Sequence, residues 1–254
     1  DFGAVSSIWA LSLLLVPLVS FNLAPVAIRA VVKARQAEED DLAAGFILFT
    51  RRMVYYTAPV TVLLFIALVW LNYPTVFDAA FGATVLMGFA VVIMALVQTG
   101  AAIGVALDKA AASQVPRELL RPAILVVALA ALTWAGQPIG LGLALLLFAL
   151  TAPANLIVQH LLLRKATAFV HAQPPRYDDR RSWITTGLFL LPTRVVNENA
   201  KMVMIFAASL TLTLEQVALL SVAISISGLL NFAITAVEVA VSSKGRPSFW
   251  RFRG

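Results

Sequence analysis

Cysteine is absent from the chain, and charged residues make up only 13% of its 254 positions. Without cysteine there can be no disulfide and no thiolate site for zinc or an iron–sulfur cluster. Water-soluble domains carry about a quarter charged residues, so this composition excludes them and disordered chains as well. The two histidines, His160 and His171, complete neither a metal site nor a triad, and no glycine-rich P-loop is present. The sequence therefore predicts no metal, no cofactor and no catalytic residue, and hence no enzyme.

What the chain does contain is apolar sequence, at 61% of all residues and a mean hydropathy of +0.90. A membrane-spanning helix needs about 20 mostly apolar residues. Uncharged runs cover 2–28, 53–77, 79–107, 122–163 and 216–237, and the fourth is long enough for two spans joined by a turn near Gly136. The sequence thus predicts an all-α, polytopic transmembrane bundle. It has about seven spans, near 4–28, 53–72, 79–107, 119–136, 139–163, 183–211 and 217–241.

The positions of the basic residues predict how the bundle is oriented. A net charge of +6 and a pI near 10.1 would suggest nucleic-acid binding in a soluble chain. Here 17 of the 19 Lys and Arg residues fall in 29–52, 108–121, 164–181 and the C-terminal tail, whereas 73–78, 135–140 and 210–216 contain none. Cytoplasmic loops are enriched in Lys and Arg. The basic character is therefore a topology signal, and no nucleic-acid partner is predicted.

The sixth predicted span carries a stripe of polar residues within its apolar sequence. Ionisable groups inside a span are costly and usually face a cavity or a partner. Two interpretations stay open: mutual neutralisation within a packed stripe, or donors along a polar path for a phosphate or pyrophosphate, which the residual charge of +1 favours. The candidate substrate-path residues share one helical face: Arg194, Asn197, Glu198 and Lys201.

Two further polar stripes occur in the fifth and seventh predicted spans, where interhelical hydrogen bonding is the first interpretation. Asn231 and Glu238 are kept as additional candidates for the substrate path, because Glu238 lies deep enough to be a proton- or cation-linked carboxylate. The stripes consist of Thr151, Asn155 and Gln159, and of Ser227, Asn231, Thr235 and Glu238.

One small-residue pattern and one linker pattern complete the predicted organisation of the chain. Gly100 and Gly104 form a small-xxx-small pattern, which predicts close approach of a neighbouring helix. The proline-containing segment 173–182 reads as an extended cytoplasmic linker between five spans and two. The predicted domains are an N-terminal lobe at 1–172, this linker, and 183–254, which holds the first two helices of a C-terminal lobe and a basic tail.

Several segments resemble those of bacterial polysaccharide (O-antigen) flippases in the multidrug/oligosaccharidyl-lipid/polysaccharide exporter superfamily. They are SQVPRELLRP at 113–122, PRYDDRRSW at 175–183, EQVALLSVA at 215–223 and LLNFAITAV at 229–237. The resemblance implies a V-shaped, two-lobed exporter fold, of which this chain would be a fragment covering helices two to eight. It also implies alternating-access transport of an undecaprenyl-pyrophosphate-linked oligosaccharide across the bacterial inner membrane, with H⁺ or Na⁺ as candidate coupling ions. A cationic cavity in that family would agree with Arg194 and Lys201.

Four other functions are compatible with the sequence at this point. A cation-coupled multidrug exporter or a peptidoglycan-precursor flippase would belong to the same superfamily, although a drug exporter should favour carboxylates over the net positive stripe. A membrane-embedded glycosyltransferase or polymerase would need catalytic groups in large outer loops, and the outer loops here are short. An inactive fragment is the remaining alternative.

Overall fold

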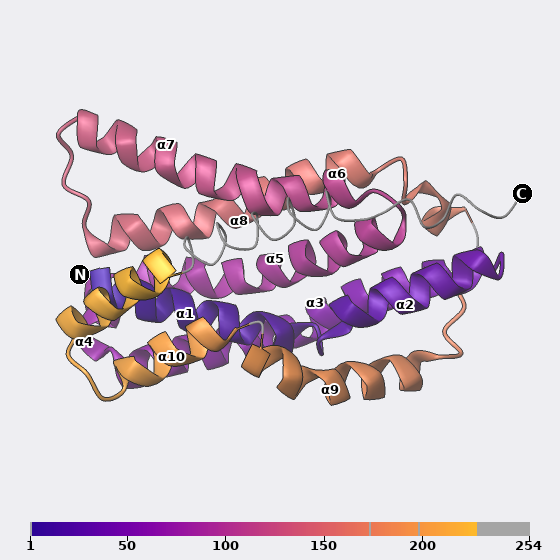
Figure 1. The fold of residues 1–254 in the computed structure, drawn as a ribbon, viewed down its shortest axis with the longest axis horizontal. Helices are drawn as coiled ribbons and strands as arrows, with labels where there is room; N and C mark the ends of the chain where they lie inside the picture. The colour runs from indigo at the N-terminus through magenta and orange to yellow at the C-terminus, as the bar shows by residue number, and fades with distance from the viewer. Residues whose placement is uncertain (1, 173, 198, 228–254) are drawn as a thin grey trace, which may run out of the picture.

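The computed structural model describes residues 2–172, 174–197 and 199–227, and every regular element in these ranges is a helix (Figure 1). The all-α prediction is confirmed. The elements are α1 (Phe2–Val19), α2 (Leu23–Gln36), α3 (Asp40–Asn72), α4 (Pro74–Ala79), α5 (Phe81–Ala106), α6 (Ala110–Val115), the π-helix η1 (Pro116–Leu120), α7 (Arg121–Trp134), α8 (Leu141–Leu163), the 3-10 helix η2 (Ala168–His171), α9 (Arg180–Asn197) and α10 (Ala200–Ser209), followed by an apolar helix at Leu214–Ser227.

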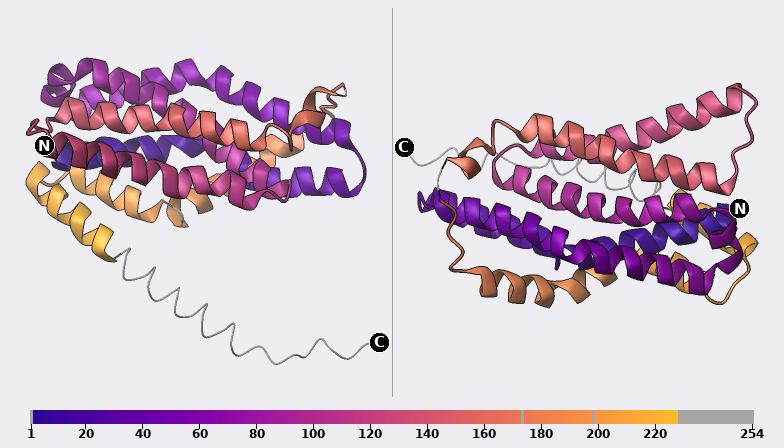
Figure 2. Two further views of the ribbon diagram at one scale, coloured as in Figure 1. Left: turned by 90° about the horizontal axis from the view of Figure 1, so that it is seen from above. Right: turned by 180° about the vertical axis from the view of Figure 1, so that it is seen from behind.

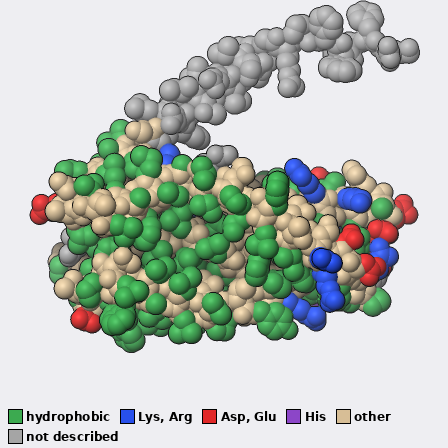
Figure 3. Space-filling model, turned by 90° about the horizontal axis from the view of Figure 1, so that it is seen from below, with side chains coloured by type: hydrophobic (Ala, Val, Ile, Leu, Met, Phe, Trp, Pro, Cys, Tyr) green, Lys and Arg blue, Asp and Glu red, His purple; other side chains and the backbone are tan. Residues whose placement is uncertain are grey.

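Four helices of the described chain are long and apolar enough to cross a membrane: Phe2–Gln36, which joins α1 and α2, and α3, α5 and α8. Even the shortest of them is about 35 Å long, which exceeds a hydrocarbon layer of about 30 Å. Large apolar side chains such as Tyr56, Val60 and Trp134 are exposed on α3 and α7. Apolar side chains are spread over the whole face in Figure 3, while most of the Lys and Arg residues on this face lie toward one end. This surface is compatible with a membrane protein.

Helix α5 lies at the centre of the bundle and packs against α1, α2, α3 and α8. The α7–α8 hairpin covers one side of it, and α1–α3 lie on the other side with α9 and α10 beyond them (Figures 1 and 2). One core cluster joins α1, α3, α5 and α8 around Phe65 and Met87. A second cluster joins α2, the start of α3 and α9, where the Trp183 ring lies 5.0 Å from that of Phe46. The two clusters hold α9 against the same body as α1–α8.

Gly100 and Gly104 lie where α6 and α8 approach α5. A Cβ at Gly100 would lie 2.6 Å from Oε1 of Gln159, and one at Gly104 would overlap with the Cβ of Ser113. The Gln159 amide donates to the carbonyls of Val97 and Ser113, both at 3.1 Å. The absence of side chains at both glycines therefore leaves room for this bonded contact.

The first predicted span, 4–28, is divided in the structure. Helix α1 ends at Val19, and Phe21 and Asn22 adopt left-handed backbone conformations with φ of 48° and 53°. Pro17 has no N–H to donate within α1, and its carbonyl accepts a 2.7 Å hydrogen bond from the Asn22 N–H. The uncharged run predicted one continuous helix because hydropathy does not report this change in backbone conformation.

Other predicted boundaries also differ. The predicted loop 108–121 is mostly helical, as α6 and η1, and the predicted span 119–136 corresponds to α7, whose 14 residues measure about 21 Å. The predicted span 183–211 is divided into α9 and α10, and most of the span predicted at 217–241 lies outside the described residues. Helices α2 and α3 extend through the predicted loop 29–52. These helices continue past the apolar runs because charged residues are disfavoured in the hydrocarbon layer, whereas they are readily accommodated in a helix outside it.

Arg176, in the predicted linker, is held against the start of α3. The Arg176 N–H donates to the Asp41 carbonyl at 3.0 Å, and its guanidinium lies 2.9 Å from Glu39, 3.5 Å from Asp41 and 3.3 Å from Asp178. The hydrogen bond to Glu39 raises the pKa of Arg176 above its ordinary value. The acidic residues at the start of α3 therefore have a structural partner, in addition to a favourable position at a helix N-terminus.

Candidate functional site

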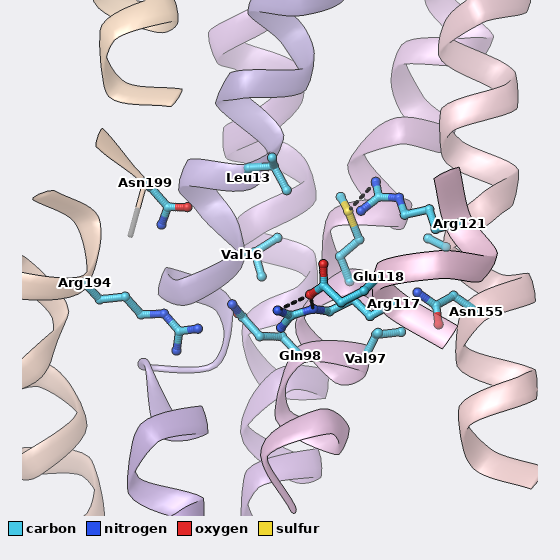
Figure 4. A pocket seen from close by; sticks show the side chains of 12 residues that line it. Leu13, Val16, Val97, Gln98, Arg117, Glu118, Arg121, Asn155, Arg194 and Asn199 are labelled. Carbon is cyan, nitrogen blue, oxygen red and sulfur yellow. Dashed lines mark hydrogen bonds and ion pairs between the residues drawn. The ribbon is translucent and has the colours of Figure 1, made fainter. Parts of the chain in front are cut away.

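A cavity of about 480 Å³, partly open to the surface, lies where α1, α5, α8, α9, η1 and the start of α7 meet (Figure 4). Its wall combines aliphatic side chains with charged and amide groups. The lining residues are Leu13, Val16, Met94, Val97, Gln98, Arg117, Glu118, Arg121, Ala152, Asn155, Arg194 and Asn199.

The depth of the cavity can be measured along the helices from their outer ends, meaning the ends next to the loops without Lys or Arg. Met94 lies 13 residues from the outer end of α5, Arg121 lies 13 from that of α7, and Asn155 lies 14 from that of α8. At 1.5 Å per residue, all three are about 20 Å from the outer ends. For helices that run roughly across a hydrocarbon layer of about 30 Å, the cavity lies at membrane depth.

Arg121, the first residue of α7, forms one wall of the cavity. Its Cζ lies 4.0 Å from the centroid of the Trp9 ring, a distance at which a cation–π interaction forms. Its Nη2 donates to Sδ of Met94 at 3.2 Å, while Nε is buried without a hydrogen-bond partner among the described residues. The guanidinium is thus held in place by soft, weak partners, and it retains a donor for a ligand.

Arg117 and Glu118 reach the cavity from η1. Nη2 of Arg117 lies 2.6 Å from Oε1 of Glu118, and Nε donates to the same oxygen at 2.8 Å. Pro116 opens this π-helical turn, which connects α6 directly to α7. π-Helical turns are rare and occur frequently at functional sites. Here the turn brings a charged pair and Arg121 to one cavity.

Arg194 enters the cavity from α9, and Asn22 orients it. Nη1 of Arg194 donates to Oδ1 of Asn22 at 3.0 Å, and Nδ2 of Asn22 donates to the Gly187 carbonyl at 3.3 Å. Asn22 is fully buried at the break between α1 and α2. Figure 4 shows the Arg194 side chain directed from α9 toward Gln98. The break in the first helix therefore positions a cationic side chain that belongs to a helix far away in sequence.

Two side-chain amides supply further polar atoms. Oε1 of Gln98 and Oδ1 of Asn155 are buried and have no hydrogen-bond partner among the described residues. Buried polar atoms are nearly always hydrogen-bonded, so such atoms at a cavity wall are candidates for contact with a ligand. The described lining residues carry three guanidinium groups and one carboxylate. This arrangement is suited to an anion with several acceptor oxygens, such as a phosphate.

The predicted substrate-path residues are only partly brought together. Arg194 lines the cavity; Asn199, which is not one of the predicted residues, joins it from the segment between α9 and α10. Lys201 lies on α10, where it is exposed and is not part of the cavity wall, and Asn197 is the last residue of α9. Three of the candidates lie outside the described residues: Glu198, Asn231 and Glu238.

Sequence reasoning missed most of the cavity wall. Arg117 falls in the predicted loop 108–121, and Arg121 falls where that loop overlaps the predicted span 119–136, 13 residues before the end of α7 at Trp134. In the structure α6, η1 and α7 follow one another without a break from Ala110 to Trp134, so Arg121 lies inside a long helical stretch and not in a loop. In the fifth predicted span, Gln159 forms the expected interhelical bonds, whereas Asn155 faces the cavity.

Comparison of the chain with protein-family models, with curated proteins and with solved structures finds no match in any of the three. The cavity and its charges are therefore the basis for assigning a function.

Proposed function

We propose that the protein is a multi-pass transporter of the bacterial inner membrane that moves a lipid-linked oligosaccharide across it by alternating access. The carrier would be undecaprenyl pyrophosphate, and the chain would form part of a two-lobed exporter fold, as its resemblance to polysaccharide flippases implies. The observation that supports this proposal is a cavity at membrane depth lined by Arg117, Arg121 and Arg194.

The charges and their separation on different helices suit a pyrophosphate group. Arg121 begins α7 and Arg194 lies on α9, so an anion between them would contact two walls of the cavity at once. A guanidinium can bind two phosphate oxygens through parallel N–H donors. Such a ligand would offset the cost of holding cationic side chains at membrane depth.

The same charges disfavour the main alternative within the superfamily. A cationic drug would meet three guanidinium groups and the single carboxylate of Glu118, which is already paired with Arg117. A peptidoglycan-precursor flippase would carry the same pyrophosphate chemistry, so a choice between glycans depends on the sugars that are moved and not on this cavity.

Replacement of Arg121 or Arg194 by glutamine is expected to weaken binding of an undecaprenyl-pyrophosphate oligosaccharide by roughly 10- to 100-fold each. A hydrogen bond to a charged group contributes about 1.5–3 kcal/mol, and 1.4 kcal/mol corresponds to a factor of ten. Affinity is measured with the full chain in lipid nanodiscs, and movement is measured in proteoliposomes as the loss of accessibility of a fluorescent glycan to an external quencher.

Arg181→Gln is the matched control, because Arg181 is an exposed arginine near the start of the same helix as Arg194. Thermal midpoints in detergent show whether each variant is folded. Wild-type affinity in both folded cavity variants would contradict the proposal, as would gradient-driven uptake of a cationic dye in place of the glycan.

A further inference from the structure

A second cavity opens between α3, α5 and α8, with a volume of about 390 Å³. We refer to it as the lateral groove. Most of its wall is apolar, and its polar side chains come from three different helices and the turn after α8. The lining residues are Arg51, Tyr55, Leu96, Thr99, Gly100, Ile103, Leu156, Ile157, Gln159, His160, Leu161, Leu163 and Thr167.

The lateral groove and the arginine-lined cavity lie on opposite faces of α5. The cavity uses Met94, Val97 and Gln98, whereas the groove uses Leu96, Thr99, Gly100 and Ile103. At about 100° per residue, the centres of these two sets are about half a turn apart around the helix. A ligand in the groove is therefore separate from the proposed transport substrate.

The polarity of the groove changes with depth. Leu96 and Leu156 each lie 15 residues from the outer ends of α5 and α8, or about 22 Å. His160 lies 19 residues from the outer end of α8 and Arg51 lies 21 from that of α3, or about 29–32 Å. Since the hydrocarbon layer is about 30 Å thick, the apolar part faces the lipid chains and the polar part lies at the inner interface.

The polar end of the groove carries positive charge and hydrogen-bond donors. Among the described residues, the side chains of Arg51 and His160 make no ion pair or hydrogen bond, and no acidic residue lines the groove. An imidazole offers an N–H donor in either protonation state. Arg164 and Lys165 follow directly after α8 and are exposed. Tyr55, which is 62% exposed, is of a residue type enriched at membrane interfaces.

We propose that the lateral groove binds one anionic phospholipid of the inner leaflet. An acyl chain lies along Leu96, Leu156 and Ile157, and the headgroup phosphate contacts Arg51 and His160. The charge complementarity at the interface and the apolar lining beyond it match the two ends of such a lipid. This site does not depend on the proposed transport function, because it occupies the other face of α5.

Native mass spectrometry of the full chain in detergent tests this site, with phosphatidylglycerol and phosphatidylethanolamine of identical acyl chains as the two probes. The wild type is expected to bind one phosphatidylglycerol at least about fivefold more tightly than phosphatidylethanolamine. Arg51→Gln combined with His160→Gln is expected to remove this preference and leave the affinities about equal. Leu156→Trp is expected to fill the apolar part of the groove and weaken both lipids.

Arg52→Gln is the matched control, since Arg52 is adjacent on α3 and has the same charge, but stacks on Tyr177 with its Cζ 5.7 Å from the ring centroid. It is expected to retain the preference. If the Arg52 variant lost the preference for phosphatidylglycerol as fully as the double variant does, the lipid would be attracted by surface charge in general, and the proposed site would be overturned. Displacement of the bound lipid by millimolar inorganic phosphate would also overturn it, because the acyl part of the groove would then contribute nothing.

Discussion

Replacement of Asn22 by alanine is expected to lower the free energy of unfolding by roughly 3.5–6 kcal/mol. A non-glycine residue other than Asn or Asp costs about 1–2 kcal/mol in the left-handed conformation that Asn22 adopts. The substitution also removes the hydrogen bond from Arg194 and the one to the Gly187 carbonyl, worth about 1.5–3 and about 1 kcal/mol. The measurement is denaturant-induced unfolding in detergent micelles, with the thermal midpoint as a second measure.

Two further substitutions at Asn22 separate the backbone from the side-chain contribution. Asn22→Gly accepts the left-handed backbone and loses only the hydrogen bonds, so it should be about 1–2 kcal/mol more stable than the alanine variant. Asn22→Asp retains an acceptor for Arg194 and should lie closest to the wild type. If alanine and glycine proved equally stable, the backbone at this break would not be restrained as described.

Replacement of Gly45 by alanine is expected to destabilise the protein by about 1–3 kcal/mol and to release the linker from α3. Within a helix this substitution ordinarily stabilises by about 0.5–1 kcal/mol. Here the new methyl group would overlap with the backbone carbonyl of Arg176, which cannot turn aside as a side chain could. Release would also separate Arg176 from Glu39 and Asp41. The thermal midpoint and the rate of tryptic cleavage at Arg176 measure the two effects.

Gly82→Ala is the matched control, because Gly82 is also helical, and its added Cβ would meet no atom within 4 Å. It is expected to be neutral or slightly stabilising and to leave the cleavage rate unchanged. If trypsin cleaved the Gly45 variant at Arg176 as slowly as it cleaves the wild type, the described contact between α3 and Arg176 would be contradicted.

The apolar runs predicted the helical class and the long helices well, since a stretch such as 79–107 has few alternatives once its length and composition are known. They failed where backbone geometry decides the outcome. Pro17 lies inside an apolar run, and only the left-handed residues that follow it show where α1 ends. Charge also misled the assignment of boundaries, because α2 and α3 extend through a basic segment that was predicted to be a loop.

Only part of the candidate site could be predicted, because the position of the other residues also depends on backbone geometry. Arg194 stood out because it interrupts an apolar span, and the structure places it at the cavity wall. Arg117 and Arg121 looked like ordinary loop charges, because the positive-inside pattern accounts for any basic residue near a span end. Their position depends on the π-helical turn η1, and nothing in the residue spacing indicates that turn. Asn22 acts through two contacts that join segments more than 160 positions apart.

The two faces of α5 have a thermodynamic consequence. One helix forms a wall of both the arginine-lined cavity and the lateral groove, so a shift or rotation of α5 changes both sites together. If occupancy of the groove alters the affinity of the cavity for its ligand by some factor, linkage requires that the cavity ligand alter the affinity for the lipid by the same factor. The composition of the inner leaflet would then act as an effector of the cavity, and the coupling energy could be measured from either side.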